Sequence, residues 1–111
     1  MRQLLLSERA TPDVIVEMLG MEESVWEDGH ARVMLLGPGR PLAAFWLHYY
    51  GSSAEMLLTP EQLPRLLEDI DHLLRDTRLP PQMTSFLRRM RNLCARALQA
   101  AATMQLSVIA D

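Results

Sequence analysis

The 111-residue chain predicts an α+β fold, with an antiparallel three- to four-stranded β-meander followed by two amphipathic helices packed on the sheet. Two observations lead to this prediction. Residues 22–58 carry short apolar runs separated by turn signals, and connections this short favour antiparallel neighbours. Residues 60–104 instead show two stretches with the 3.6-residue apolar period of helices. Strand signals followed by helix signals are typical of α+β domains.

Length and composition are those of one soluble globular domain spanning residues 1–111. Hydrophobic residues make up 49% of the chain and charged residues 23%, which is ordinary for globular proteins and argues against disorder. No apolar run approaches the roughly 20 residues that cross a bilayer, and the N-terminal run is too short for a signal peptide. The single cysteine precludes an intrachain disulfide, so a cytoplasmic location is expected.

The charge of the chain is unevenly distributed. All 11 basic residues are arginines, and the net charge is −3. Residues 1–81 hold seven arginines against thirteen acidic residues (−6), and residues 82–111 hold four against one (+3). An acidic protein is a poor non-specific binder of nucleic acid, although the basic C-terminal segment leaves that function open.

The first twenty residues form a lead-in to the predicted sheet. Residues 2–6 fit either a short edge strand or one helical turn. A Thr-Pro-Asp start signal and a following glycine predict a short helix at residues 12–19. The β-branched run at residues 14–16 favours a strand instead, and this alternative stays open.

The β-meander is predicted from residues 22–58. Strands at residues 24–26 and 31–36 are expected to be joined by a hairpin turn through Asp28-Gly29. The Gly-Pro-Gly run at residues 37–39 is a strong signal for a further turn, of type II. A third strand follows that turn.

That third strand, at residues 42–50, is apolar or aromatic on both faces, whereas a strand with one solvated face alternates cleanly. Both faces are therefore expected to be covered, the second one by the C-terminal helix or by a second copy of the protein. A homodimer is predicted on this ground. The candidate interface residues are Phe45, Trp46, Leu47, His48, Tyr49, Tyr50, Phe86 and Met90.

The helix predicted at residues 60–76 has the clearest pattern in the chain. Large aliphatic side chains recur at helical spacing between residues 63 and 74. Charged and polar side chains occupy the other side, where Asp69, Asp71 and His72 are expected to face solvent.

The start of this helix is also signalled. A short strand at residues 55–58 leads into Thr59 and Gln62, which have the spacing of a capping box. Because Pro64 loosens the first turn, regular helix is expected from about Leu63.

A second helix is predicted at residues 82–104, after Pro80-Pro81. Its broad apolar stripe includes Cys94, which is expected to be buried and unreactive. Residues 106–109 form a candidate final strand that pairs within the chain or across a dimer. The opposite side of the helix carries the candidate anion-binding residues Arg88, Arg89, Arg91 and Arg96.

No catalytic residue, cofactor site or metal site is predicted. The three histidines, His30, His48 and His72, lie on different predicted elements without ligand spacing, and no CxxC, HExxH, GxSxG or P-loop motif is present. The protein is therefore not expected to be an enzyme. The least favoured alternative is a site between subunits that uses His48 and Tyr50.

The order of meander and helix over residues 22–76 is similar to that of the single-strand DNA-binding transcriptional coactivator and Whirly families. The run Leu-Thr-Pro-Glu-Gln at residues 58–62, which leads into the helix, also looks like theirs. The resemblance implies a sheet that binds single-stranded nucleic acid. The sheets of those families are basic, whereas the strands predicted here carry almost no positive charge beyond Arg32.

The function predicted from the sequence is that of a non-enzymatic protein-interaction module. It would form a homodimer and act on an unidentified protein as an adaptor, a chaperone-like factor or an inhibitor, without contacting a membrane. The alternative is a nucleic-acid-binding regulator, with the four C-terminal arginines on phosphates and the sheet aromatics on bases.

Overall fold

The computed structural model describes residues 3–51 and 55–109. It confirms the α+β class and an antiparallel sheet of four strands, but takes most of those strands from the ends of the chain. The elements in chain order are β1 (Gln3–Glu8), β2 (Ile15–Leu19), α1 (Glu23–Met34), α2 (Pro41–Gly51), β3 (Met56–Leu58), α3 (Leu63–Leu74), α4 (Pro81–Gln99) and β4 (Met104–Ile109).

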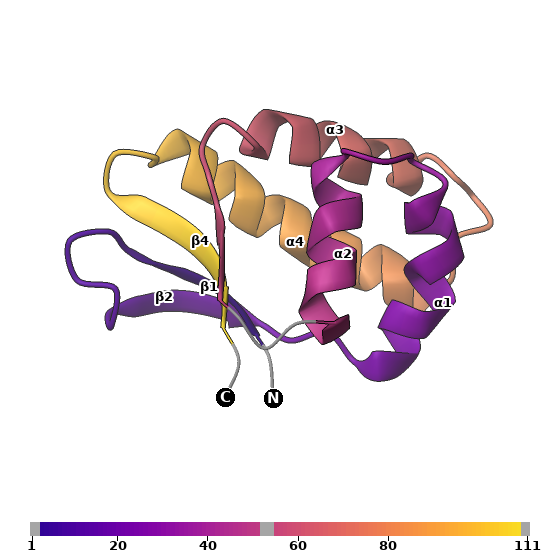
Figure 1. Ribbon diagram of the computed structural model, residues 1–111, viewed down its shortest axis with the longest axis horizontal. Coiled ribbons are helices and arrows are strands. Elements are labelled where there is room, and N and C mark those ends of the chain that lie inside the picture. The colour runs from indigo at the N-terminus through magenta and orange to yellow at the C-terminus, as the bar shows by residue number, and fades with distance from the viewer. Residues whose placement is uncertain (1–2, 52–54, 110–111) are drawn as a thin grey trace.

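The sheet has the strand order β2-β1-β4-β3, and all neighbouring strands are antiparallel (Figure 1). Its two central strands, β1 and β4, come from opposite ends of the chain and pair from Gln3↔Ile109 to Glu8↔Met104. The N-terminal run is thus a central strand and not an edge strand. The predicted final strand is confirmed, and it pairs within the chain.

The helices lie along one face of the sheet and beyond one end of it (Figure 1). α4 runs along one face of the sheet and contacts β2 and β4, while α1 and α2 lie together beyond the end of the sheet (Figure 1). α3 packs on α4 and α2. One core of apolar side chains, contributed by all eight elements, fills the space between the sheet and the helices.

Helix α3 confirms the sequence prediction, including its start. Its buried positions, Leu63, Leu66, Ile70 and Leu73 among them, follow the predicted stripe. The backbone N–H of Thr59 donates to the Gln62 side-chain oxygen at 3.1 Å, which is one half of the capping box. The short strand expected just before this helix is also confirmed, as β3.

Helix α4 is confirmed but ends at Gln99, five residues before its predicted end. The backbone N–H groups of Thr103 and Met104 both donate to the Ala100 carbonyl, which forms the turn into β4. Because Met104 pairs with Glu8 in the sheet, tertiary pairing overrides the helix propensity of the alanine-rich run at residues 100–102.

The predicted meander is wrong over residues 22–51, which form the helical hairpin α1–α2. Phe45, Trp46 and Tyr49 are all buried, and their spacing places them on one side of a helix. α2 is apolar nearly all round because α1 and α3 pack on it, and such a helix shows no amphipathic period. Since no meander precedes α3, the resemblance to the coactivator and Whirly families does not extend to the fold.

Gly29 lies in the middle of α1 and not in the predicted hairpin turn. A Cβ atom on Gly29 would lie 2.7 Å from the Trp46 ring and 2.7 Å from the Met83 side chain, so this glycine allows α1 to approach α2 and α4 closely. The turn at residues 37–39 is confirmed, but it joins two helices. Gly37 and Gly39 have φ values of 102° and 82°, which glycine adopts without strain.

The short helix predicted at residues 12–19 is wrong, and the alternative of a strand is confirmed by β2. The β-branched run favours the extended backbone, and pairing with β1 provides its hydrogen bonds. The register shifts between Leu6↔Glu17 and Ser7↔Ile15, so Val16 is an extra residue that bulges this edge strand.

Two reciprocal hydrogen bonds join α1 and α2. The indole N–H of Trp26 donates to the Trp46 carbonyl at 2.6 Å, and the indole N–H of Trp46 donates to the Trp26 carbonyl at 3.0 Å. Both tryptophans therefore satisfy their polar groups inside the helical hairpin, which explains why large aromatic side chains occur there.

Two adjacent tyrosines bind the backbone of Met21, just before α1. The Met21 N–H donates to the Tyr49 hydroxyl at 2.9 Å, and the Tyr50 hydroxyl donates to the Met21 carbonyl at 2.6 Å. The pKa of Tyr50 is raised, chiefly by burial and then by the charges of Glu23 and Glu22. The Tyr50 hydroxyl is thus held in its donating form.

Tyr50→Phe is expected to lower the free energy of unfolding by about 1 kcal/mol at neutral pH, the usual net contribution of one hydrogen bond. Because the pKa of Tyr50 lies above its ordinary value of 10.0 in the folded protein, this contribution is present below that pH and disappears as pH rises through the folded-state pKa. Urea unfolding of both proteins, from neutral to strongly alkaline pH, measures the difference. A difference that grows with pH would contradict the assignment.

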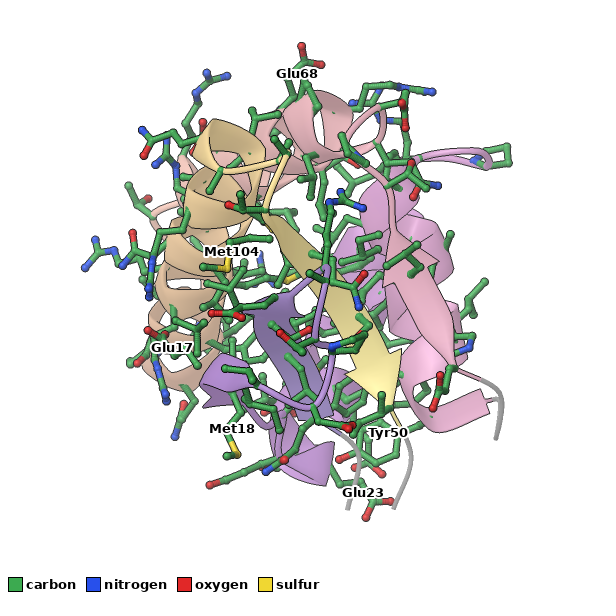
Figure 2. All side chains as sticks on the ribbon, turned by 90° about the vertical axis from the view of Figure 1, so that its left-hand side faces the viewer. Glu17, Met18, Glu23, Tyr50, Glu68 and Met104 are labelled. Atoms are coloured by element: carbon green, nitrogen blue, oxygen red, sulfur yellow. The ribbon has the colours of Figure 1, made fainter. Side chains whose placement is uncertain are left out.

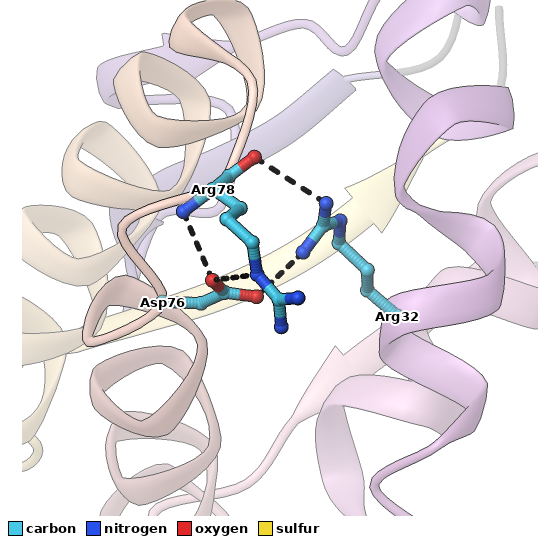
Figure 3. A network of polar contacts seen from close by, with 3 residues as sticks. All are labelled: Arg32, Asp76 and Arg78. Atoms are coloured by element: carbon cyan, nitrogen blue, oxygen red, sulfur yellow. Dashed lines mark hydrogen bonds and ion pairs between the residues drawn. The ribbon is translucent and has the colours of Figure 1, made fainter.

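A polar network ties α1 to the connection between α3 and α4 (Figure 3). Arg32 donates to Asp76 at 2.6 Å and to the Arg78 carbonyl at 3.3 Å. The pKa of Asp76 is lowered, chiefly by the hydrogen bond from the Arg78 backbone N–H. The ionised form of Asp76 is therefore the one that holds this connection.

Candidate interaction surface

The structure places most of the predicted interface residues in its core and not on its surface. Because residues 42–50 form a helix, only part of that run can face outward. Leu47 and Tyr50 are exposed, and His48 is half-buried. The predicted interface residues that are buried in the core are Phe45, Trp46, Tyr49, Phe86 and Met90.

The four predicted anion-binding arginines do not form one free cluster. Arg91 donates to Asp71 at 2.6 Å, a bond that raises the pKa of Arg91, and Arg96 donates to Glu17 at 2.6 Å. Their charges are thus balanced within the protein. Arg88 and Arg89 are exposed and have no ion pair within the described part of the chain.

The sequence predicts that Asp69 faces solvent, and this prediction is wrong. The Asp69 side chain is buried, with 2% of its surface exposed. Its carboxylate accepts a hydrogen bond from Arg40 at 2.7 Å and another from the Leu42 backbone N–H at 3.3 Å. Because Leu42 lies in the first turn of α2, Asp69 caps that helix from α3. By contrast, Asp71 is partly exposed and His72 is exposed.

Two groups with potential chemical reactivity, the Cys94 thiol and the Tyr50 hydroxyl, are held inside the fold. Burial raises the pKa of the Cys94 thiol to about 12, so it stays protonated at neutral pH. The Tyr50 hydroxyl is bonded to the backbone of Met21. Within residues 3–51 and 55–109, no group of three or more His, Cys, Asp or Glu side chains could hold a metal ion.

The strongest candidate surface is the face of the sheet opposite α4, which no helix covers in the described part of the chain (Figure 1). Strand pairing assigns the residues of this face, since Leu5 pairs with Met18 and Ser107, and Ser107 with Leu57. Glu17 belongs to the opposite face and lies on the α4 side of β2, away from Met18 (Figure 2). We call this surface the open sheet face, formed by Gln3, Leu5, Ser7, Ile15, Met18, Leu57, Gln105, Ser107 and Ile109.

A groove of about 600 Å³ lies over the two central strands of the open sheet face. Leu5 and Ile109 contribute apolar floor, while Ser7 and Ser107 contribute hydroxyl groups. The charged residues that line the groove are Asp13 and Glu55, both acidic, at its rim. The groove therefore combines an apolar floor with a negative edge.

Exposed apolar side chains occur at both edges of the sheet, four on or beside β2 and one on β3, each 41–49% exposed. Ile15, Met18 and Leu57 belong to the open sheet face. The four at the β2 edge are close in sequence, and a cluster of exposed apolar side chains is a feature of interaction sites. These five residues are Val14, Ile15, Val16, Met18 and Leu57.

Part of this surface has a sequence signal. The run Met-Gln-Leu-Ser-Val-Ile at residues 104–109 alternates with a period of two, which predicts a strand with one apolar face. Its Ser107 lies on the open sheet face and its Leu106 in the core. Which strands would join it, and which face α4 would cover, depend on pairing between distant segments.

Comparison of the chain with protein-family models, with curated proteins and with solved structures found no match. Among the described helices, none is long and apolar enough to span a membrane. The function of the protein must therefore be inferred from its own surface.

Proposed function

We propose that the protein is a non-enzymatic protein-interaction module that binds its partner on the open sheet face. The observation that carries this proposal is a sheet face that no described helix covers and that exposes Ile15 and Met18 at one edge and Leu57 at the other. A partner segment placed over the groove would bury the exposed side chains of Ile15 and Leu57, which line it. Burial of such apolar area is the main driving force of association.

The charge at the rim of the groove favours a partner with basic residues. Among the described residues, Asp13 and Glu55 line the groove and no arginine does. A segment with apolar side chains in its centre and lysine or arginine at its ends would match both features, since complementary charge favours correct encounter. An acidic partner would meet repulsion at the same two carboxylates.

A homodimer is the second candidate, favoured by the exposed edge strand β2. Two copies of an edge strand can pair antiparallel across a two-fold axis. The bulge at Val16 interrupts the regular row of hydrogen-bonding groups, which is a common way to protect an edge strand. If two copies paired face to face, Asp13 and Glu55 of both copies would lie at one interface and repel each other. A different partner protein is therefore the better-supported occupant.

The nucleic-acid alternative has less support in the structure. Trp46 and Tyr49, which were expected to stack on bases, are buried in the core. Arg91 and Arg96 have internal carboxylate partners. Of the residues proposed to bind nucleic acid phosphates, only Arg88 and Arg89 are left without an ion pair among the described residues.

Peptides that differ only in flanking charge test the proposed function. An apolar peptide flanked by lysines is expected to bind more tightly than the same peptide flanked by glutamates, as measured by fluorescence anisotropy. Met18→Lys and Leu57→Lys should each weaken binding roughly tenfold or more, because they remove apolar contact and add a repelling charge. The matched control is Leu35→Lys, at an 86% exposed position beyond the end of α1.

Equal losses in all three variants, or equal binding of both peptides, would contradict the proposal. Light scattering at low and high salt separates the two candidates. A monomer supports a different partner protein, whereas a salt-independent dimer that Met18→Lys dissociates would identify a second copy as the occupant.

A further inference from the structure

A second cavity lies away from the open sheet face, between the β2–α1 junction and the start of α4. Its volume is about 440 Å³, within the range of pockets that hold small molecules. Leu19, Val25 and Phe86 line it with side chains that are otherwise part of the core and at most 7% exposed. The apolar wall is therefore fixed by the packing of three different elements.

The polar wall of this cavity comes from α4. Gln82, Ser85 and Arg89 all line the cavity, and their spacing of three and four residues places them on one side of the helix. Phe86 lies beside them in sequence, so the same helix presents apolar and polar groups to one space. The cavity thus suits a molecule with a hydrocarbon part and a polar end.

The charge of Arg89 favours a ligand whose polar end is negatively charged. Arg91 and Arg96 are neutralised by Asp71 and Glu17, whereas Arg89 has no ion pair with any described residue. A guanidinium group matches a carboxylate through two parallel hydrogen bonds. Glu22 also lines the cavity, and its negative charge disfavours ligands that carry several negative charges, such as nucleotides.

We propose that this cavity binds a small organic monocarboxylate with an aliphatic or aromatic hydrocarbon group. The hydrocarbon would lie on Leu19, Val25 and Phe86, and the carboxylate would accept hydrogen bonds from Arg89. Ser85 supplies a further donor on the same wall of the cavity. This site is independent of the open sheet face and of the function proposed for it.

Three probes of matched length test the site: octanoate, its neutral amide, and octanedioate. Octanoate is expected to shift the backbone NMR signals of residues 19–25 and 82–89 and to leave those of β3 and β4 unchanged. The amide and the dianion should bind roughly tenfold more weakly or worse, since hydrogen bonds to charged groups are the stronger ones and like charges repel.

Arg89→Gln should weaken octanoate binding by a similar factor. The control is Arg88→Gln, which changes an exposed arginine outside the cavity and should leave octanoate binding unchanged. Both positions are exposed, so both variants are expected to fold. The proposal is overturned if octanoate produces no shifts in the cavity. It is also overturned if the amide binds as well as octanoate, or if the two arginine variants behave alike.

Discussion

Gly29→Ala is expected to lower the free energy of unfolding by about 1–3 kcal/mol, the usual effect of overpacking a core. Helix propensity alone predicts the opposite change, because alanine stabilises a helix interior by about 1 kcal/mol relative to glycine. A Cβ atom at this position would lie 2.7 Å from both the Trp46 ring and the Met83 side chain. The methionine end can move, but the Trp46 ring is held by its indole hydrogen bond.

Gly51→Ala is the matched control, because a Cβ atom there meets nothing within 4 Å. Its effect should stay within about 0.5 kcal/mol, as for most surface substitutions. Urea unfolding followed by circular dichroism measures both variants. If Gly29→Ala were as stable as the parent protein, the close approach of α1 to α2 would be wrong. Adding Trp46→Phe should reduce the cost of Gly29→Ala, which a double-mutant cycle detects.

Asp69→Ala is expected to lower the free energy of unfolding by about 2–3 kcal/mol, because the change leaves the buried Leu42 N–H and the partly buried Arg40 side chain without their acceptor. The carboxylate is almost fully buried and accepts hydrogen bonds from both Arg40 and the Leu42 backbone. Its removal leaves the first turn of α2 without a cap and the guanidinium group without its buried partner. Chemical unfolding at neutral pH gives the difference directly.

Asp71→Ala provides the comparison on the same helix. Asp71 pairs with Arg91, but both side chains are about two-fifths exposed, so this substitution should cost less than about 1 kcal/mol. The sequence alone predicts the same outcome for both aspartates. Equal effects at the two positions would mean that Asp69 does not cap α2.

The parts of the fold that could be predicted from the sequence are those specified by local signals. The stripe from Leu63 to Leu74 and the capping pair Thr59 and Gln62 are contained in one short segment, and α3 follows both. α4 was equally predictable except for its end, which is set by the pairing of Met104 with Glu8.

The remaining elements depend on contacts that no local pattern records. α2 is covered on several sides, so its sequence lacks an amphipathic period and its aromatic residues favour a strand prediction. Gly29 looks like a turn residue, although its role is to make room for Trp46. Asp69 looks solvated until Arg40 and Leu42, from a distant turn, are placed beside it.

The candidate surface could be predicted only in part for the same reason. The alternation in β4 indicates one apolar and one polar face, and the β-branched run at residues 14–16 indicates β2. That these two strands flank β1, and that α4 covers only one side, follows from pairing across almost the whole chain. Of the interface residues predicted within 42–50, Phe45, Trp46 and Tyr49 lie in the core because this run forms a helix and not a strand.

The pairing of β1 with β4 has a consequence for the order in which the protein can assemble. β1 is made first among the described elements and β4 last, so a growing chain must hold β1 without its second neighbour while every helix is being synthesised. During that time β1 can pair only with β2, and one edge of this hairpin stays open to other chains. The centre of the sheet can therefore close only after β4 has been made, when every described helix has already been synthesised.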